Sequence, residues 1–204
     1  STSGSTGATK LVRLSATAVD ENARAIGDYL DLDAEERAIT TLPPGYCYGL
    51  SIINSHLAVG ATTILYQGTV ADRAFRSTID QFGATSFGGV PHTYELLERT
   101  GFLNDLPSSI RTMTQAGGRL APELVGSIAR RATAASARLV VMYGQTEATA
   151  RMAYLPPEAA QDHPDCIGRP IPGGRFELAD PLTGLPTDGA GELVYSGPDV
   201  MMGY

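Results

Sequence analysis

The chain has 204 residues, of which 43% are hydrophobic and 18% charged, and its net charge at pH 7 is −7. This composition is ordinary for a globular protein and excludes an intrinsically disordered chain. The negative charge repels a phosphate backbone, so we expect no nucleic-acid partner. The two cysteines, Cys47 and Cys166, fit neither a disulfide framework nor a metal-site spacing, and no leader peptide is visible, which together indicate a cytoplasmic protein.

The first 155 residues alternate between two hydrophobic periods, one typical of strands and one typical of helices. Ser15 is expected to cap a helix. Strand-like runs lie at 11–14, 38–42, 61–66, 84–87, 110–116 and 137–143. Helical runs lie at 19–30, 50–59, 72–82, 91–99 and 121–134. Strands that alternate with crossover helices predict an α/β fold, with a parallel sheet covered by helices.

One long stretch carries no acid, lysine or arginine, and its apolar part at 50–66 is nearly long enough to span a bilayer. Polar residues at 54–56 interrupt this part, and Gly60 breaks it just before a run rich in strand-forming residues. We therefore predict a buried helix followed by a buried strand, and no membrane span.

The pattern changes after residue 155. Prolines punctuate 156–204, and only 175–178 and 192–195 are strand-like there. Because proline interrupts both helices and central strands, this part is not expected to continue the helix-covered sheet. The sequence predicts an α/β core at 1–155 followed by a small β-rich region at 156–204.

The chain opens on hydroxyl-bearing residues, glycines and one lysine, Lys10. Glycines let the backbone approach a phosphate closely, amides and hydroxyls donate to its oxygens, and lysine adds a point charge. The same composition also suits a flexible linker, so it leaves both interpretations open. It is not a Walker A loop, because Thr9 rather than glycine precedes Lys10 and an extended segment follows.

A second polar cluster follows the strand predicted at 137–143. Tyr143, Thr146 and Glu147 come at its carboxyl end, where open α/β sheets bind ligands. The alternative is an ordinary turn in which Thr146 caps a helix and Glu147 lies in its first turn. Upstream, the glycines of 116–124 form a turn that enters a helix.

These segments together resemble the adenylate-forming (AMP-binding) superfamily, which includes acyl-CoA synthetases, aryl-CoA ligases, luciferases and the adenylation domains of peptide synthetases. Thr9 stands where the family usually has proline. The resemblance implies an internal piece of the family's N-terminal domain, truncated at its start and lacking the C-terminal subdomain. The matching segments, in family order, are 2–10, 116–124, 141–147, 167–173 and 191–204.

The resemblance implies an ATP site. Tyr143 is expected to stack on adenine, Thr146 to contact the α-phosphate and the carboxylate, and Glu147 to hold Mg²⁺. Catalytic roles are implied for Lys10, Thr146 and Glu147. The further nucleotide-binding residues it implies are Thr2, Ser3, Gly4, Ser5, Thr6, Gly7, Gly117, Gly118, Arg119, Gly144 and Gln145.

The segment 42–50 resembles the one that carries a histidine in acyl-CoA and aryl-CoA ligases, with Tyr46 at the histidine position. Amino-acid-activating relatives place an aspartate here to pair with the substrate's ammonium group, and a buried ammonium without a partner is costly. The nearest acids, Glu36 and Asp72, lie well away in sequence. The sequence therefore favours a carboxylic acid without an α-amino group.

The acid is expected to contact Tyr46, Gly88, His92 and Gln145, although His92 equally suits a solvated helix start. The implied reaction converts the acid to an acyl-adenylate, followed by thioester formation with CoA or a carrier protein. An amino-acid adenylation domain that loads a carrier protein and a non-catalytic nucleotide-binding domain remain alternatives. We expect the 204 residues alone to bind ATP weakly and to show no turnover.

Overall fold

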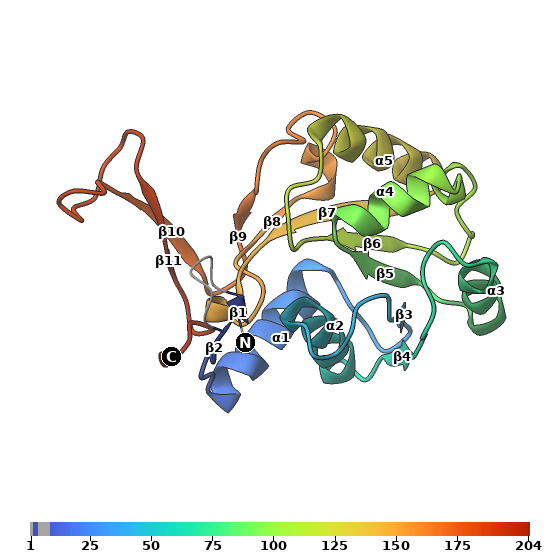
Figure 1. The fold of residues 1–204 in the computed structure, drawn as a ribbon, viewed down its shortest axis with the longest axis horizontal. Helices are drawn as coiled ribbons and strands as arrows, with labels where there is room; N and C mark the ends of the chain where they lie inside the picture. Colours follow the sequence, from blue (N-terminus) through green and yellow to red (C-terminus); the bar gives the residue numbers. More distant parts are fainter. Residues whose placement is uncertain (1, 4–8) are drawn as a thin grey trace.

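The computed structural model describes residues 2–3 and 9–204, and its centre is one large sheet (Figure 1). The strands follow the order β4-β3-β5-β6-β7-β8-β9. The first five are parallel, and β8 and β9 add an antiparallel edge. The bounds are β3 Arg37–Ile39, β4 Thr62–Ile64, β5 Ser86–Gly89, β6 Thr112–Gln115, β7 Arg138–Tyr143, β8 Ala153–Leu155 and β9 Arg169–Pro170. This confirms the predicted α/β fold.

Helices cover both faces of the large sheet. Figure 1 shows α1 and α2 on one side and α4 and α5 on the other, and α3 shares a core with the second pair. The α-helices are α1 Ala16–Tyr29, α2 Cys47–Ala58, α3 Arg73–Phe82, α4 Pro91–Arg99 and α5 Pro122–Ala134. Short 3-10 turns lie at Phe102–Asn104, Thr146–Ala148 and Pro157–Ala159.

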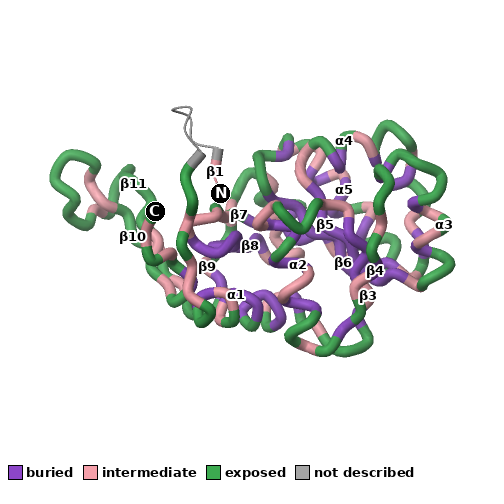
Figure 2. Tube along the Cα trace, turned by 60° about the horizontal axis from the view of Figure 1, so that its bottom comes forward, coloured by how far each residue is buried: buried purple, intermediate pink, exposed green. Residues whose placement is uncertain are grey.

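Side chains of strand β7 alternate between the two cores that flank the large sheet. In β7, Leu139 packs in the core with α3, α4 and α5, whereas Val140 and Met142 pack in the core with α1 and α2. This alternation is expected because successive strand residues point to opposite faces. Figure 2 shows the resulting buried centre, and it shows the far end of the chain mostly exposed.

Local sequence signals explain several helix ends. The Ser15 side chain accepts a hydrogen bond from the amide of Ala18 at 3.0 Å, which confirms the predicted cap of α1. Helix α3 ends at Gly83, whose φ of 61° suits glycine. Helix α4 begins at Pro91, as expected for a residue without an amide hydrogen.

The strand predicted at 11–14 was wrong. The pairing lies earlier, between β1 (Thr2–Ser3) and β2 (Thr9–Lys10), and Arg13 makes only an isolated bridge with Gly203. An apolar run becomes a strand only where a neighbouring strand can accept its hydrogen bonds. Among the described residues, 11–14 has such a neighbour at Arg13 alone.

A small antiparallel sheet follows the large one. It consists of β10 (Arg175–Ala179) and β11 (Glu192–Ser196), and it projects from the body of the molecule as a hairpin (Figure 1). Both strands were predicted from the sequence. However, β9 also lies beyond residue 155 and joins the large sheet, so the division into 1–155 and 156–204 stays a prediction.

The uncharged stretch folds as the helix α2 followed by the strand β4. Both contribute to the cores, through Ile52 of α2 and Ile64 of β4. In the part of the chain that the structure describes, every helix is too short or too polar to cross a lipid bilayer.

Candidate functional site

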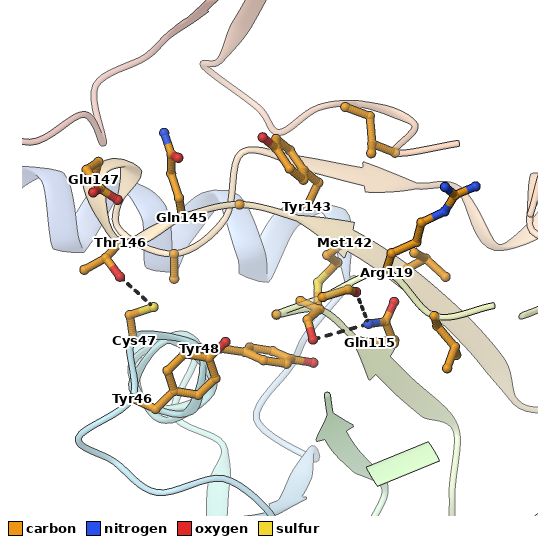
Figure 3. Close-up of a pocket in the computed structure, with 18 of the residues that line it drawn as sticks. Tyr46, Cys47, Tyr48, Gln115, Arg119, Met142, Tyr143, Gln145, Thr146 and Glu147 are labelled. Carbon is orange, nitrogen blue, oxygen red and sulfur yellow. Dashed lines mark hydrogen bonds between the residues drawn. The ribbon is translucent and has the colours of Figure 1, made fainter. Parts of the chain in front are cut away.

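A cleft of about 920 Å³ opens beyond the carboxyl ends of β6 and β7. The loops after β6 and β7 and the first turn of α2 line it (Figure 3), together with Thr2, Lys10, residues 164–167 and Tyr204. Its volume lies within the range of small-molecule sites, and its position is where open α/β sheets bind ligands. The cleft is therefore the candidate functional site.

The two ends of the predicted site face this one cleft. Thr2 and Lys10, at the paired ends of β1 and β2, line it, and so does Glu147 from the loop after β7. Thr2 and Lys10 are direct partners in the pairing of these two short strands. The predicted contacts at Gly4, Ser5, Thr6 and Gly7 lie outside the described residues, as does the side chain of Ser3.

The glycine loop after β6 is held by its own strand. The Gln115 side-chain amide donates to the carbonyl oxygens of Ala116 at 3.3 Å and Gly118 at 2.9 Å. Gly117 has a φ of 79°, and a Cβ there would lie 2.4 Å from the Tyr46 hydroxyl. Because only glycine fits this conformation and this gap, the loop exposes its backbone to the cleft next to Arg119.

The loop after β7 turns back sharply. A Cβ on Gly144 would lie 2.0 Å from the carbonyl oxygen of Ala150, so glycine is needed where the two arms meet. Thr149 and Ala150 have positive φ values of 51° and 89°, conformations that cost energy for residues other than glycine. The amide of Met152 closes the turn by donating to the carbonyl oxygen of Tyr143 at 2.9 Å.

This turn presents the predicted polar side chains to the cleft. Tyr143 is 39% exposed, so its ring is accessible to a planar ligand. Thr146 donates from its hydroxyl to the sulfur of Cys47 at 3.3 Å, which connects the loop to α2. Gln145 and Glu147 line the cleft on either side of Thr146 (Figure 3).

Two tyrosines at the start of α2 border the cleft. The rings of Tyr46 and Tyr48 meet edge to face with centroids 6.3 Å apart. The Tyr48 hydroxyl donates to the carbonyl oxygen of Thr114 at 2.8 Å. Burial raises the pKa of Tyr48 to about 12, and burial also raises the pKa of Tyr46. Both phenols therefore stay protonated near neutral pH and offer neutral surface.

Two residues predicted to contact the acid are not in the cleft. A Cβ on Gly88 would lie 2.9 Å from the Tyr48 hydroxyl, so Gly88 packs behind Tyr48 in the buried strand β5. His92 is on the first turn of α4, where its 69% exposed side chain lies 3.6 Å from Glu95. The structure thus brings Tyr46 and Gln145 to the cleft and leaves Gly88 and His92 outside it.

The two acids nearest in sequence to the α2 segment have other partners. Glu36 is buried, accepts a hydrogen bond from Thr85 and lies 3.3 Å from Arg111. Asp72 accepts from the amide of Thr69 at 2.7 Å. Neither acid lines the cleft. The cleft-lining carboxylates among the described residues are Glu147 and Asp165.

The carboxylates of the cleft suit a metal ion that is bound together with the phosphates of a nucleotide. Among residues 2–3 and 9–204, no group of three or more His, Cys, Asp or Glu side chains could hold an ion alone. Mg²⁺ is usually bound through one or two carboxylates, with substrate phosphates and water as further ligands. Glu147 fits that arrangement.

Several cleft residues were not among the predicted ligand contacts. Tyr48, Met142 and Tyr204 lie within the segments 42–50, 141–147 and 191–204 that resemble the family, but no contact was expected for them. Gln115 and Asp165 lie outside the matching segments. Their place in the cleft depends on how the loops pack.

Comparison with known proteins adds an independent observation. The family model described as "AMP-binding enzyme" matches residues 2–204. The chain is 33% identical over its whole length to the indoleacetate–CoA ligase of Aromatoleum aromaticum and 29% identical to the 2-succinylbenzoate–CoA ligase of Bacillus licheniformis. It spans only 39% and 41% of the lengths of these relatives.

Solved structures agree in fold. The o-succinylbenzoate CoA synthetase (MenE) of Bacillus subtilis, in complex with the acyl-adenylate intermediate OSB-AMP, superposes with a TM-score of 0.86 at 25% identity. The match covers 98% of this chain and 40% of that one. VinN in complex with L-aspartate superposes with a TM-score of 0.83 at 29% identity, over 99% of this chain and 50% of that one. The chain therefore belongs to the AMP-binding enzyme family.

Proposed function

We propose that this chain forms the nucleotide- and acid-binding core of an enzyme that activates a carboxylic acid with ATP and then joins the acyl group to CoA. The observation that carries the proposal is the shared cleft, which brings Lys10 together with Tyr143 and Glu147 from two distant parts of the sequence. The similarity to two CoA ligases supports it.

The chemistry of the residues that line the cleft supports binding of ATP there. The exposed ring of Tyr143 offers a stacking surface for adenine, and the backbone of Gly117 and Gly118 allows close approach. Lys10 and Thr2 line the same cleft, and in this proposal they contact the β- and γ-phosphates. Lysine and hydroxyl donors are suited to phosphate oxygens.

The first step is an in-line displacement at phosphorus. A carboxylate oxygen of the acid forms a bond to the α-phosphorus, and the bond from that phosphorus to the bridging oxygen of pyrophosphate breaks. Such a reaction needs positioning and charge neutralisation more than acid–base groups. In this proposal Lys10 neutralises the departing pyrophosphate, and the Thr146 hydroxyl donates to the α-phosphate or to the carboxylate.

The second step transfers the acyl group. A thiolate attacks the acyl carbon, the thioester bond forms, and AMP leaves with the electron pair of the broken carbon–oxygen bond. Mg²⁺ held by Glu147 would supply further positive charge to the phosphates. Since this chain spans about two fifths of the relatives' lengths, residues outside it are expected to take part in binding the thiol.

The border of the cleft near α2 favours an acid without a positive charge. Tyr46 and Tyr48 are uncharged near neutral pH, and Met142 is apolar. An edge-to-face tyrosine pair suits a flat aromatic acid, because aromatic rings pack favourably at such angles. We infer that the substrate is a small acid with an apolar or aromatic body.

Amino-acid activation is the second candidate. VinN, whose structure was solved with L-aspartate, is 29% identical to this chain. The AMB antimetabolite synthetase AmbB of Pseudomonas aeruginosa is 32% identical, with this chain spanning 16% of it. Asp165 lines the cleft and could pair with an ammonium group. A carrier protein would then accept the acyl group.

The test is ATP–pyrophosphate exchange by the protein at its natural length, with panels of aryl, fatty, short-chain and amino acids. Exchange with an aryl acid supports the proposal, and exchange with amino acids alone selects the second candidate. Lys10→Ala and Glu147→Gln should each lower kcat/KM about 100-fold. Arg24→Ala, which alters an exposed pair with Glu21 outside the cleft, should leave exchange unchanged. ATP binding without exchange for any acid would select a non-catalytic nucleotide-binding role.

A further inference from the structure

The side chain of Tyr204 contacts both Lys10 and Glu147, a cation and an anion that line the cleft. The Lys10 ammonium lies 4.5 Å from the centroid of the Tyr204 ring. The Tyr204 hydroxyl donates a hydrogen bond to Oε1 of Glu147 at 2.9 Å. All three residues line the same cleft. Tyr204 is thus a shared neighbour of the two groups with the greatest expected role in phosphate binding.

Backbone hydrogen bonds fix the approach of Tyr204. The amide of Met201 donates to the carbonyl oxygen of Glu147 at 2.8 Å. The amide of Arg13 donates to the carbonyl oxygen of Gly203 at 3.0 Å, and the amide of Met202 donates back to Arg13 at 2.8 Å. The segment before Tyr204 is therefore attached both to the loop after β7 and to the segment after β2.

Among the described residues, Lys10 and Glu147 make no direct ion pair, and each contacts Tyr204 instead. A lysine and a glutamate that face one cleft attract each other, and a direct pair would occupy the groups needed for phosphate and metal. A cation over an aromatic face and a neutral phenol on a carboxylate are each modest interactions. The hydrogen bond to Glu147 raises the pKa of Tyr204, so the phenol keeps the proton that it donates.

The hydrogen bond also selects one oxygen of Glu147. It is made to Oε1, and within residues 2–3 and 9–204 no hydrogen bond to Oε2 is present. A carboxylate held in this way keeps one oxygen available to a ligand. The ligand does not first have to displace an ion-pair partner.

We propose that Tyr204 is a positioning residue that keeps Lys10 and Glu147 apart and preset for the phosphates and the metal of the nucleotide. This inference rests on the proposed function, since it assigns Lys10 and Glu147 their roles there. It adds one further requirement: an uncharged aromatic hydrogen-bond donor must lie between the two charged side chains.

Two variants at position 204 separate the two contacts. Tyr204→Phe keeps the ring under Lys10 and removes the hydrogen bond, so the Mg²⁺ concentration for half-maximal exchange should rise about 3-fold to 10-fold. Tyr204→Leu removes both contacts, so the KM for ATP should also rise about tenfold while the KM for the acid stays unchanged. A merely structural role would change the apparent affinities for ATP, Mg²⁺ and acid together.

The matched control is Tyr66→Phe. The Tyr66 hydroxyl also makes an exposed hydrogen bond, to the carbonyl oxygen of Thr69 at 3.2 Å, but neither residue lines the cleft. This variant should leave the Mg²⁺ and ATP dependence of exchange unchanged. The inference is overturned if Tyr204→Leu matches the unmodified protein in both dependences.

A second readout needs neither ATP nor acid. Lys10 is the only lysine in the 204 residues, so its rate of acylation by an amine-selective reagent can be followed in one peptide by mass spectrometry. Tyr204→Leu should slow this acylation severalfold, because a direct pair with Glu147 holds the ammonium charged, and adding Glu147→Gln should restore it. Unchanged reactivity overturns the inference. Failure of the proposed function appears separately, as an absence of exchange in the unmodified protein.

Discussion

The two faces of the large sheet are packed by different means. The face toward α3, α4 and α5 is largely aromatic and aliphatic, and Phe75 packs against Phe87 and Phe102 with ring centroids 5.8 and 5.4 Å away. The face toward α1 and α2 also buries polar groups. Arg151 is the largest of them and is 1% exposed.

Directional contacts hold Arg151 and the side-chain NH₂ group of Asn22 in this polar interior. Nε of Arg151 donates to Ser51 and Nη1 to Tyr29, each at 3.1 Å, while its guanidinium lies 5.1 Å from the Tyr48 ring centroid. No ion pair joins Arg151 to a carboxylate within the described residues. Asn22 donates both to the backbone of Arg151 and to Asp199, at 3.0 Å each.

The two faces differ in how precisely their contacts orient the residues above them. Apolar burial stabilises without fixing direction, whereas hydrogen bonds fix both distance and angle. The polar face lies under the loop after β7, where Thr149 donates to the carbonyl oxygen of Asp199 at 2.6 Å. We infer that the apolar face supplies most of the stability and that the polar face orients the cleft.

The largest expected effect is on the apolar face. Phe75→Ala should lower the free energy of unfolding by about 3–5 kcal/mol, because a fully buried ring is replaced by a cavity. Urea unfolding followed by circular dichroism measures this change. A loss below about 1 kcal/mol would show that the aromatic cluster can collapse around the gap. The apolar face would then not be the main source of stability.

A smaller effect on stability is expected at Arg151. Arg151→Met should cost less than about 1.5 kcal/mol, since it removes a buried charge without a carboxylate partner and keeps much of the side-chain volume. The same variant should lower ATP–pyrophosphate exchange, because the loop after β7 loses its support. If Arg151→Met and Phe75→Ala destabilised the protein equally and exchange were unaffected, the inference that the apolar face stabilises and the polar face orients the cleft would be contradicted.

The smallest effect is expected at Asp199 and depends on pH. Burial raises the pKa of this carboxyl, which accepts hydrogen bonds from Tyr195 and Asn22. Its contribution to stability is therefore most favourable below its unfolded-state pKa of about 3.9 and is lost as pH rises through the folded-state value. Asp199→Asn lacks this titration.

Urea unfolding of both proteins between pH 4 and 7 (roughly the range over which a raised carboxyl titrates) checks this prediction. The stability of Asp199→Asn relative to the unmodified protein should improve as pH rises. Stability curves that stay parallel across the range would mean that the carboxyl is solvated in the folded protein.

Strands and helices with clear periodicity could be predicted from the sequence. Helix α4 was expected at 91–99 and lies there, because Pro91 marks its start and the apolar period is regular. The edge strands β8 and β9 were missed, since three-residue and two-residue pairings carry almost no period of their own. They exist because β7 offers a free edge.

The site divides in the same way. Motifs in the sequence reveal the glycines that must avoid a clash and the charged groups at strand ends. Lys10 and Glu147 were both identified from such motifs. The position of Gly88 behind Tyr48 was not visible, because it depends on which side of β5 the helix α2 covers.

The alternation of strands and helices, the family resemblance and the types of side chain offered to a nucleotide follow from the order of residues along the chain. Which of these side chains share a cleft, and the contacts of Tyr204 with Lys10 and Glu147, depend on the folded structure. Periodicity and capping act within a few residues of the chain, whereas the cleft joins segments far apart in sequence, such as those of Cys47 and Thr146, which are 99 residues apart.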